Sequence, residues 1–228
     1  MNLPSALKKI ATAFQLPKKL DHYTYLFCTP EEIIIRNFLG GCPDPVYITF
    51  GNKHPKDRPK KLASFIASTY FKQEQQQGNG CVITHKEILR ELAIAKRIPG
   101  QKLCNKTLRF YQRLLDNIEK QQKLILISPQ KNEQVFNEIL LHELVHELVD
   151  INKLRPLSWK WNEGLVTYLT HYALNKQQLF EKEVALTNDK MEDIYDNYTH
   201  QWALLFKPAK SASTRKKILL RQLKKLKA

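Results

Sequence analysis

The chain has 228 residues and a formal net charge of +15; 43% of its residues are hydrophobic and 10% are aromatic. A composition this apolar excludes a fully disordered chain and suits one large folded domain. Nine basic residues and no acidic one lie between Lys207 and the end of the chain, so the C-terminal tail carries most of the excess charge.

Targeting features and cysteines favour a cytoplasmic protein. No uninterrupted apolar run reaches the roughly 18 residues of a membrane-spanning helix. Lys8 and Lys9 interrupt the N-terminal apolar positions before a signal-peptide core forms. The cysteines form no Cys-x-x-Cys pair, so we expect free, buried thiols rather than a second zinc site. They are Cys28, Cys42, Cys81 and Cys104.

The first third of the sequence predicts alternating helices and a strand. Thr29, Pro30 and the acids that follow are typical of a helix start, and Gly40-Gly41 should end that helix. Residues 46–50 are rich in β-forming side chains and predict a strand. Residues 62–77 predict a helix, although Thr69-Tyr70-Phe71 would also suit a strand, and residues 76–80 predict a loop.

Residues 84–128 predict two helices followed by a short buried strand at residues 123–128. One interpretation is the helix and strand that precede the active helix of a zinc peptidase. The other is a winged helix-turn-helix, in which residues 106–121 would be the recognition helix.

The following segment predicts a long helix at about residues 132–149, and Pro156 should enforce a break after it. Ser158 can cap a second helix that continues to about Asn175. Residues 182–186 and 193–206 favour further helices.

The long helix carries the pattern His142-Glu143-Leu144-Val145-His146. Residues four apart share one helix face, so His142 and His146 can bind one Zn²⁺, while Glu143 can reach a water beside the metal. Chance produces such a match in roughly one comparable chain in a hundred, but a buried histidine pair without a metal would be costly in this apolar helix.

A catalytic zinc site needs a third protein ligand and one open position. Glu163 lies at the start of the second helix and can supply a carboxylate from that separate element. Asp150 is four residues beyond His146 on the same helix, which is too far along a straight helix to reach the same ion. We therefore predict His142, His146 and Glu163 as the zinc ligands.

The pair of motifs, His142-Glu143-x-x-His146 and Asn162-Glu163-Gly164, resembles the gluzincins, the thermolysin-like and aminopeptidase N-like zinc peptidases. The resemblance covers about residues 123–175. It implies that Glu163 is the third zinc ligand and that Glu143 activates water. One position departs from the thermolysin type: Thr167 stands where an Asp would support a ligand histidine.

An oxyanion formed during hydrolysis normally needs a further donor. His171 lies about 80° around the helix from Glu163 and faces the metal better than Tyr168, at about 140°. Related peptidases supply a Tyr or His from a downstream helix, which favours Tyr195, Tyr198 or His200. Our predicted catalytic group is Glu143, His171, Tyr195 and His200.

These features predict an α+β fold: a mostly helical, zincin-like domain with a small sheet before the motif helix, and a basic C-terminal helix. We expect a metallopeptidase-like domain at residues 1–206, with its active-site core at about 123–206, and a tail at 207–228. The expected function is zinc-dependent hydrolysis of a protein or peptide. The alternatives are a DNA-associated protein whose zinc site is regulatory or processing, and a zinc-stabilised structural module, against which the intact Glu143 argues.

The tail places Leu219, Leu223 and Leu226 on one helix face among lysines and arginines. Such a helix can bind nucleic acid or an anionic membrane surface. It can equally dock its leucines on the domain and expose its lysines to water.

Overall fold

The computed structural model describes residues 2–20, 23–29, 32, 33, 36, 80–96, 101–119, 123–130, 132–156, 158–176 and 191–227. The expected strand at 46–50 and the expected helices at 62–77 and 182–186 lie outside the described residues. So does most of the helix expected to begin at Thr29, of which Glu32, Ile33 and Arg36 are described and are helical.

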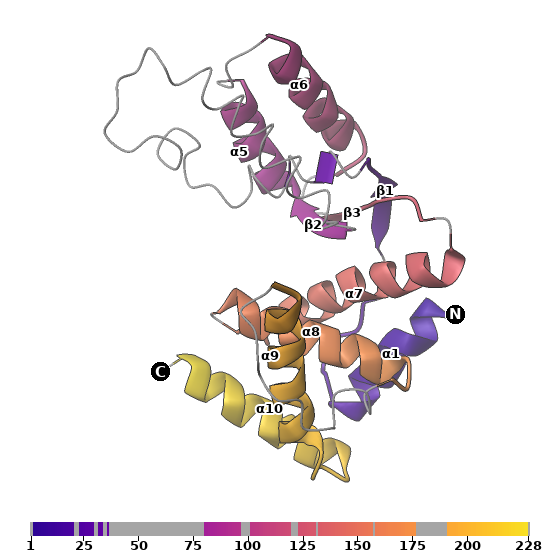
Figure 1. Cartoon of the computed structure of the whole chain (residues 1–228), viewed down its shortest axis with the longest axis vertical. Coiled ribbons are helices and arrows are strands. Elements are labelled where there is room, and N and C mark those ends of the chain that lie inside the picture. The colour runs from indigo at the N-terminus through magenta and orange to yellow at the C-terminus, as the bar shows by residue number, and fades with distance from the viewer. Residues whose placement is uncertain are drawn as a thin grey trace. The chain divides into compact units, whose positions relative to one another are not determined.

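The chain divides into two compact units, residues Tyr23–Lys131 and residues Met1–His22 together with Asn132–Ala228. The second of these, which we call the helical unit, contains only helices among its described residues (Figure 1). They are α1 (Leu3–Ala13), α7 (Glu133–Ile151), α8 (Trp159–Ala173), α9 (Met191–Phe206) and α10 (Ala212–Lys227).

The other unit, which we call the mixed unit, combines three strands with a pair of helices. They are β1 (Thr24–Phe27), β2 (Gly80–Thr84), α5 (His85–Ala95), α6 (Gln101–Asp116) and β3 (Lys123–Ile127). β3 is the central strand and pairs in parallel with β1 and antiparallel with β2. Residues Leu124–Ile127 of β3 are buried. The central position of β3 in the sheet explains why these residues form a continuous apolar run.

Local sequence determines where α7 begins and ends. The side chain of Asn132 accepts hydrogen bonds from the backbone N–H groups of Gln134 and Val135, and this caps the first turn. After Ile151 the chain turns at Lys153, whose φ of 57° lies in the left-handed region. The long helix expected at about residues 132–149 is therefore confirmed, with its C-terminal end two residues later.

The largely aliphatic core of the helical unit contains an aromatic cluster. Phe14, which follows α1, lies edge-on to Tyr172 of α8 and Phe206 of α9 at ring-centroid distances of 5.6 and 5.1 Å. Trp202 stacks on Phe206 at 5.6 Å. These contacts join α1, α8 and α9 around one apolar centre, which gives α8 a fixed support.

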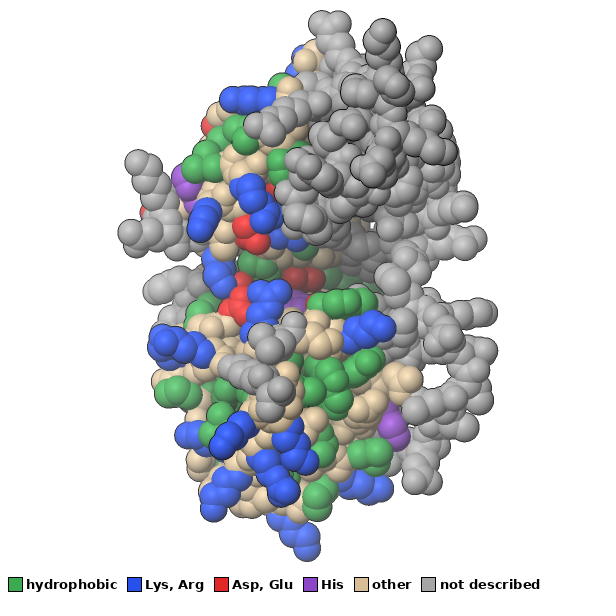
Figure 2. Space-filling view, turned by 90° about the vertical axis from the view of Figure 1, so that its left-hand side faces the viewer, with side chains coloured by type: hydrophobic (Ala, Val, Ile, Leu, Met, Phe, Trp, Pro, Cys, Tyr) green, Lys and Arg blue, Asp and Glu red, His purple; other side chains and the backbone are tan. Residues whose placement is uncertain are grey.

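The basic helix α10 docks on the helical unit. Leu219 and Leu223 are buried. Arg215 donates hydrogen bonds of 3.0 Å to the carbonyl oxygens of Ala13 and Ala209. The leucine face of the tail therefore packs inward, and the space-filling view shows Lys and Arg side chains gathered over the part that holds α10 (Figure 2).

The structure confirms an α+β protein with a small sheet whose strands all precede α7 in the chain. The two helices and the strand expected within residues 84–128 are confirmed as α5, α6 and β3. α6 begins five residues before the expected residue 106 and ends at Asp116. Gly80, which we expected in a loop, begins β2. Among the described residues, no helix is both long and apolar enough to cross a membrane.

Candidate metal centre

Two antiparallel helices of the helical unit carry the three expected ligands. Near one end of the pair, Lys176, just beyond α8, donates a 2.6 Å hydrogen bond to Glu138 in the first half of α7. At the other end, Glu163 in the first turns of α8 reaches His146 in the second half of α7. The antiparallel packing therefore places the start of α8 beside the motif of α7.

The three ligand side chains point their donor atoms at one another. The Nε2 atoms of His142 and His146 are 3.2 Å apart. Each lies 3.4 Å from Oε2 of Glu163. This is the group of His, Cys, Asp and Glu side chains that could hold a metal ion among the residues the structure describes. The set predicted from sequence spacing is thus brought together in space.

The group is accessible, and its electrostatics favour an ionised carboxylate. The side chains of His142, His146 and Glu163 are 26%, 18% and 22% exposed to solvent. Burial raises the pKa of Glu163, but hydrogen bonds from the two histidines outweigh burial and hold the pKa well below its ordinary value. Glu163 is therefore ionised at neutral pH, which is the form that binds a cation.

Asn162 is a member of this site to which the sequence analysis assigned no role. Its side chain is 4% exposed, and its Nδ2 atom lies 3.3 Å from Nδ1 of His146. Its Oδ1 atom is buried without a hydrogen-bond partner. Amide nitrogen and oxygen positions are interchangeable by rotation, and the rotated amide would accept a hydrogen bond from Nδ1–H of His146. That bond would leave Nε2 of His146 free to bind a metal.

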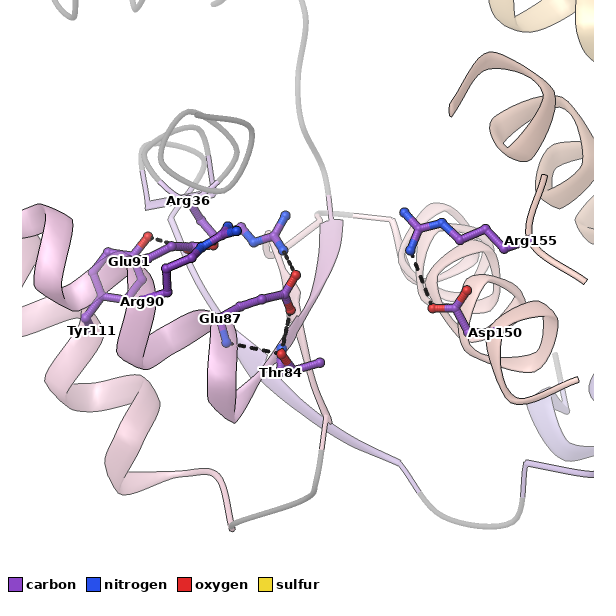
Figure 3. Close-up of polar contacts among 8 residues, drawn as sticks. All are labelled: Arg36, Thr84, Glu87, Arg90, Glu91, Tyr111, Asp150 and Arg155. Carbon is purple, nitrogen blue, oxygen red and sulfur yellow. Dashed lines mark hydrogen bonds and ion pairs between the residues drawn. The ribbon is translucent and has the colours of Figure 1, made fainter. Parts of the chain in front are cut away.

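The signal for Asn162 was present in the sequence, because it directly precedes Glu163 and lies sixteen residues after His146. Only the packing of α7 against α8 identifies which ring nitrogen it contacts. Thr167, where a supporting acid was expected, lies in α8 and is partly exposed. Asp150 lies 3.8 Å from Arg155 in an ion pair near the end of α7 (Figure 3), which agrees with its exclusion as a ligand.

The predicted catalytic residues occupy three helices. Glu143 follows His142 on α7 and is 7% exposed. His171 lies on α8, close enough to Lys176, Glu138 and His142 for their charges to act on it. Burial is the main cause that lowers the pKa of His171, and Lys176 and His142 lower it further, so its imidazole is neutral at neutral pH.

The two candidates on α9 are placed by a close helix–helix contact. A Cβ atom on Gly164 of α8 would lie 2.5 Å from Cβ of Tyr198 and 2.9 Å from the backbone nitrogen of Thr199. Gly164 thus lets α9 approach α8 directly beside the ligand Glu163. His200 is 8% exposed on α9. Tyr195 lies one turn before Thr199, and its side chain falls outside the described residues.

Comparison of the chain with protein-family models, curated proteins and solved structures found no match. The site therefore has to be interpreted from its own chemistry.

Proposed function

We propose that the chain is a zinc-dependent metallopeptidase of the gluzincin type. The observation that carries this proposal is the triangle of donor atoms, with sides of 3.2, 3.4 and 3.4 Å. Ligands about 2.0–2.1 Å from a zinc ion at tetrahedral angles would be about 3.3–3.4 Å from one another. Two imidazole nitrogens and one carboxylate oxygen also match the donor chemistry of catalytic zinc sites of the His₂Glu kind.

The partial exposure of all three ligands supports a catalytic site in preference to a purely structural one. Structural zinc sites are closed by four protein ligands, whereas catalytic sites keep a position open for water or substrate. The group comprises three protein ligands among the described residues. A zinc ion held there would polarise the substrate carbonyl and make water more acidic.

The residues of the chain then have distinct tasks. His142, His146 and Glu163 would hold the ion, and Asn162 would orient the imidazole of His146 through the Nδ1 atom of that ring. Glu143 takes a proton from the attacking water and returns it to the leaving amine. His171 is neutral and can donate a hydrogen bond to the developing oxyanion, and Tyr195 and His200 on α9 are the alternative donors predicted from the sequence.

The proposal is tested by peptidase activity on a peptide library or a denatured protein, with the zinc content measured in every sample. We expect about one zinc ion per chain in the wild type and in Glu143→Gln, and turnover only in the wild type. Glu133→Gln, the same change at the exposed start of α7, is the matched control and should leave both quantities unchanged.

His142→Ala should lose both zinc and turnover, because two ligands bind the ion far more weakly than three. If the wild type binds zinc but cleaves no peptide that the Glu143→Gln variant leaves intact, the peptidase assignment is contradicted. A protein that takes up no zinc would contradict the metal site itself.

A further inference from the structure

The mixed unit contains a helix pair that the metal centre does not use. Residues 96–100 connect α5 to α6. A third helical segment packs on the pair, because Ile33 lies in the same core cluster as Ile88 and Tyr111. Three helical segments around one core, with a short connection between the last two, are typical of helix-turn-helix proteins.

A polar network fixes these segments to one another (Figure 3). Glu91 of α5 is completely buried and accepts a 2.8 Å hydrogen bond from the hydroxyl group of Tyr111 on α6. Glu87 accepts hydrogen bonds from Thr84 at the start of α5 and lies 3.8 Å from Arg36. Glu91 is therefore committed to internal contacts, whereas Glu87 keeps a 39% exposed side chain whose charge is paired with Arg36.

The outer face of α6 is polar and basic. Its inner face buries Phe110, Tyr111 and Leu114, and Asp116, at its last position, is the only acidic residue in the helix. Among the described side chains of α6, five are exposed, and they are Asn105, Lys106, Arg109, Gln112 and Asp116. Gln112 donates a 3.0 Å hydrogen bond to Asp116. α5 adds exposed basic side chains, which are Lys86, Arg90 and Lys96. Among the described side chains of the two helices, every exposed charge is therefore positive except those of Asp116 and of Glu87, which is paired with Arg36.

We propose that this face binds duplex DNA, with α6 entering the major groove. A helix with its side chains is about 10–12 Å wide and the major groove about 12 Å, so α6 fits the groove. Arg, Lys, Asn and Gln are the side chains that hydrogen-bond to base edges there. The two aromatic residues of α6 are Phe110 and Tyr111, and both are buried. α6 therefore offers no aromatic platform on which single-stranded bases could stack.

The test uses the full-length chain and a fluorescently labelled, mixed-sequence DNA duplex of about 20 base pairs, two turns of the double helix. Fluorescence anisotropy is measured over a range of salt concentrations from about 50 mM. Reversal of both charges, Lys106→Glu with Arg109→Glu, should weaken binding at least about tenfold. It should also lower the slope of log affinity against log salt by about two, because two phosphate or base contacts are lost.

The matched control reverses two exposed charges on α10, Lys217→Glu with Arg221→Glu. It changes the net charge by the same amount and should weaken binding less than about threefold. Equal weakening by both double variants would overturn the proposal in favour of general attraction to a basic protein. Unchanged binding by the α6 variant, or tighter binding of single-stranded DNA or RNA than of duplex, would overturn it as well.

Because the reversed side chains are exposed, the urea unfolding midpoint should stay close to that of the wild type. If the charge reversal lowers that midpoint, Arg109→Gln replaces it. That single change removes a charge without introducing a repulsive one and should weaken duplex binding about threefold to tenfold, and unchanged binding would overturn the proposal.

Discussion

At the scale of single residues, the proposed metal centre would depend on a hydrogen bond as much as on its ligands. His146 can bind a metal through Nε2 only when its proton sits on Nδ1, and Asn162 is the side chain beside Nδ1. A sequence motif defines ligands by their spacing, but it does not define which group orients them. The three-residue group that the structure brings together was predictable from the sequence for this reason, whereas the contact of Asn162 with His146 required the packing of α8 on α7.

We expect Asn162→Ala to weaken zinc affinity by about ten- to a hundredfold, since partners that orient ligands contribute about that much. The affinity is measured by competition with a chromophoric chelator. Asn152→Ala is the matched control. Asn152 follows the end of α7, and its side-chain amide hydrogen-bonds to the backbone of Lys18 and not to a proposed ligand. Equal zinc affinity in the wild type and Asn162→Ala would show that Asn162 does not orient His146.

A second residue-scale prediction concerns pH. Burial raises the pKa of Glu91, and this outweighs the opposing effects of Arg36 and the Tyr111 hydrogen bond. The folded state therefore holds the proton more tightly, and the free energy of unfolding falls as the pH rises from about 4.5 through the folded pKa. Glu91→Gln keeps an acceptor for Tyr111 but cannot ionise, so it should abolish this fall in urea unfolding measured from pH 4.5 to 8.

Glu87 provides the opposite control on the same helix. Burial raises the pKa of Glu87. Hydrogen bonds from Thr84 and the charge of Arg36 lower this pKa by more than burial raises it, so the net shift is downward. Its stabilising contribution is present at neutral pH and is lost as the pH falls below about 4.5. Glu87→Gln should therefore lose stability at pH 7, whereas Glu91→Gln should not. Parallel behaviour of the two variants would contradict the assigned directions.

At the scale of elements, the sequence predicted long helices better than short strands. Apolar periodicity and Pro156 located α7 and α8 to within a few residues. β1 and β2 have four and five residues, and each is held by β3, which lies far away in the chain. No local pattern defines such pairing. The start of α6 was missed because its first residues carry mainly polar side chains and add nothing to the apolar repeat.

The contact between α8 and α9 gives a prediction at this scale. Replacing glycine by alanine inside a helix normally stabilises it by about 0.5–1 kcal/mol. Gly164→Ala should instead destabilise the helical unit by about 1–3 kcal/mol, because the new Cβ atom would overlap the backbone of α9. Urea unfolding followed by tryptophan fluorescence measures the change. A gain in stability would show that α9 does not approach α8 as closely as described.

At the scale of the whole molecule, the two units carry different chemistry. The three proposed metal ligands belong to the helical unit, and the basic helix pair belongs to the mixed unit. All three tryptophans of the chain lie in the helical unit, Trp159 and Trp161 on α8 and Trp202 on α9. Trp161 lies two residues before the proposed ligand Glu163, and its ring centroid is 5.2 Å from that of Tyr198. Tryptophan fluorescence therefore reports on the unit that contains the metal centre.

This separation predicts how zinc changes unfolding. A ligand that binds only the folded state adds about 2.7 kcal/mol of stability at a free concentration one hundred times its dissociation constant. Zinc should therefore raise the urea midpoint followed by tryptophan fluorescence. Far-ultraviolet circular dichroism, which follows helices of both units, should show an additional transition that zinc does not move. The ligand variant His142→Ala should lose the fluorescence shift and keep the additional transition. If zinc moved every transition together, the two units would unfold as one cooperative body and the metal centre would stabilise the basic helix pair as well.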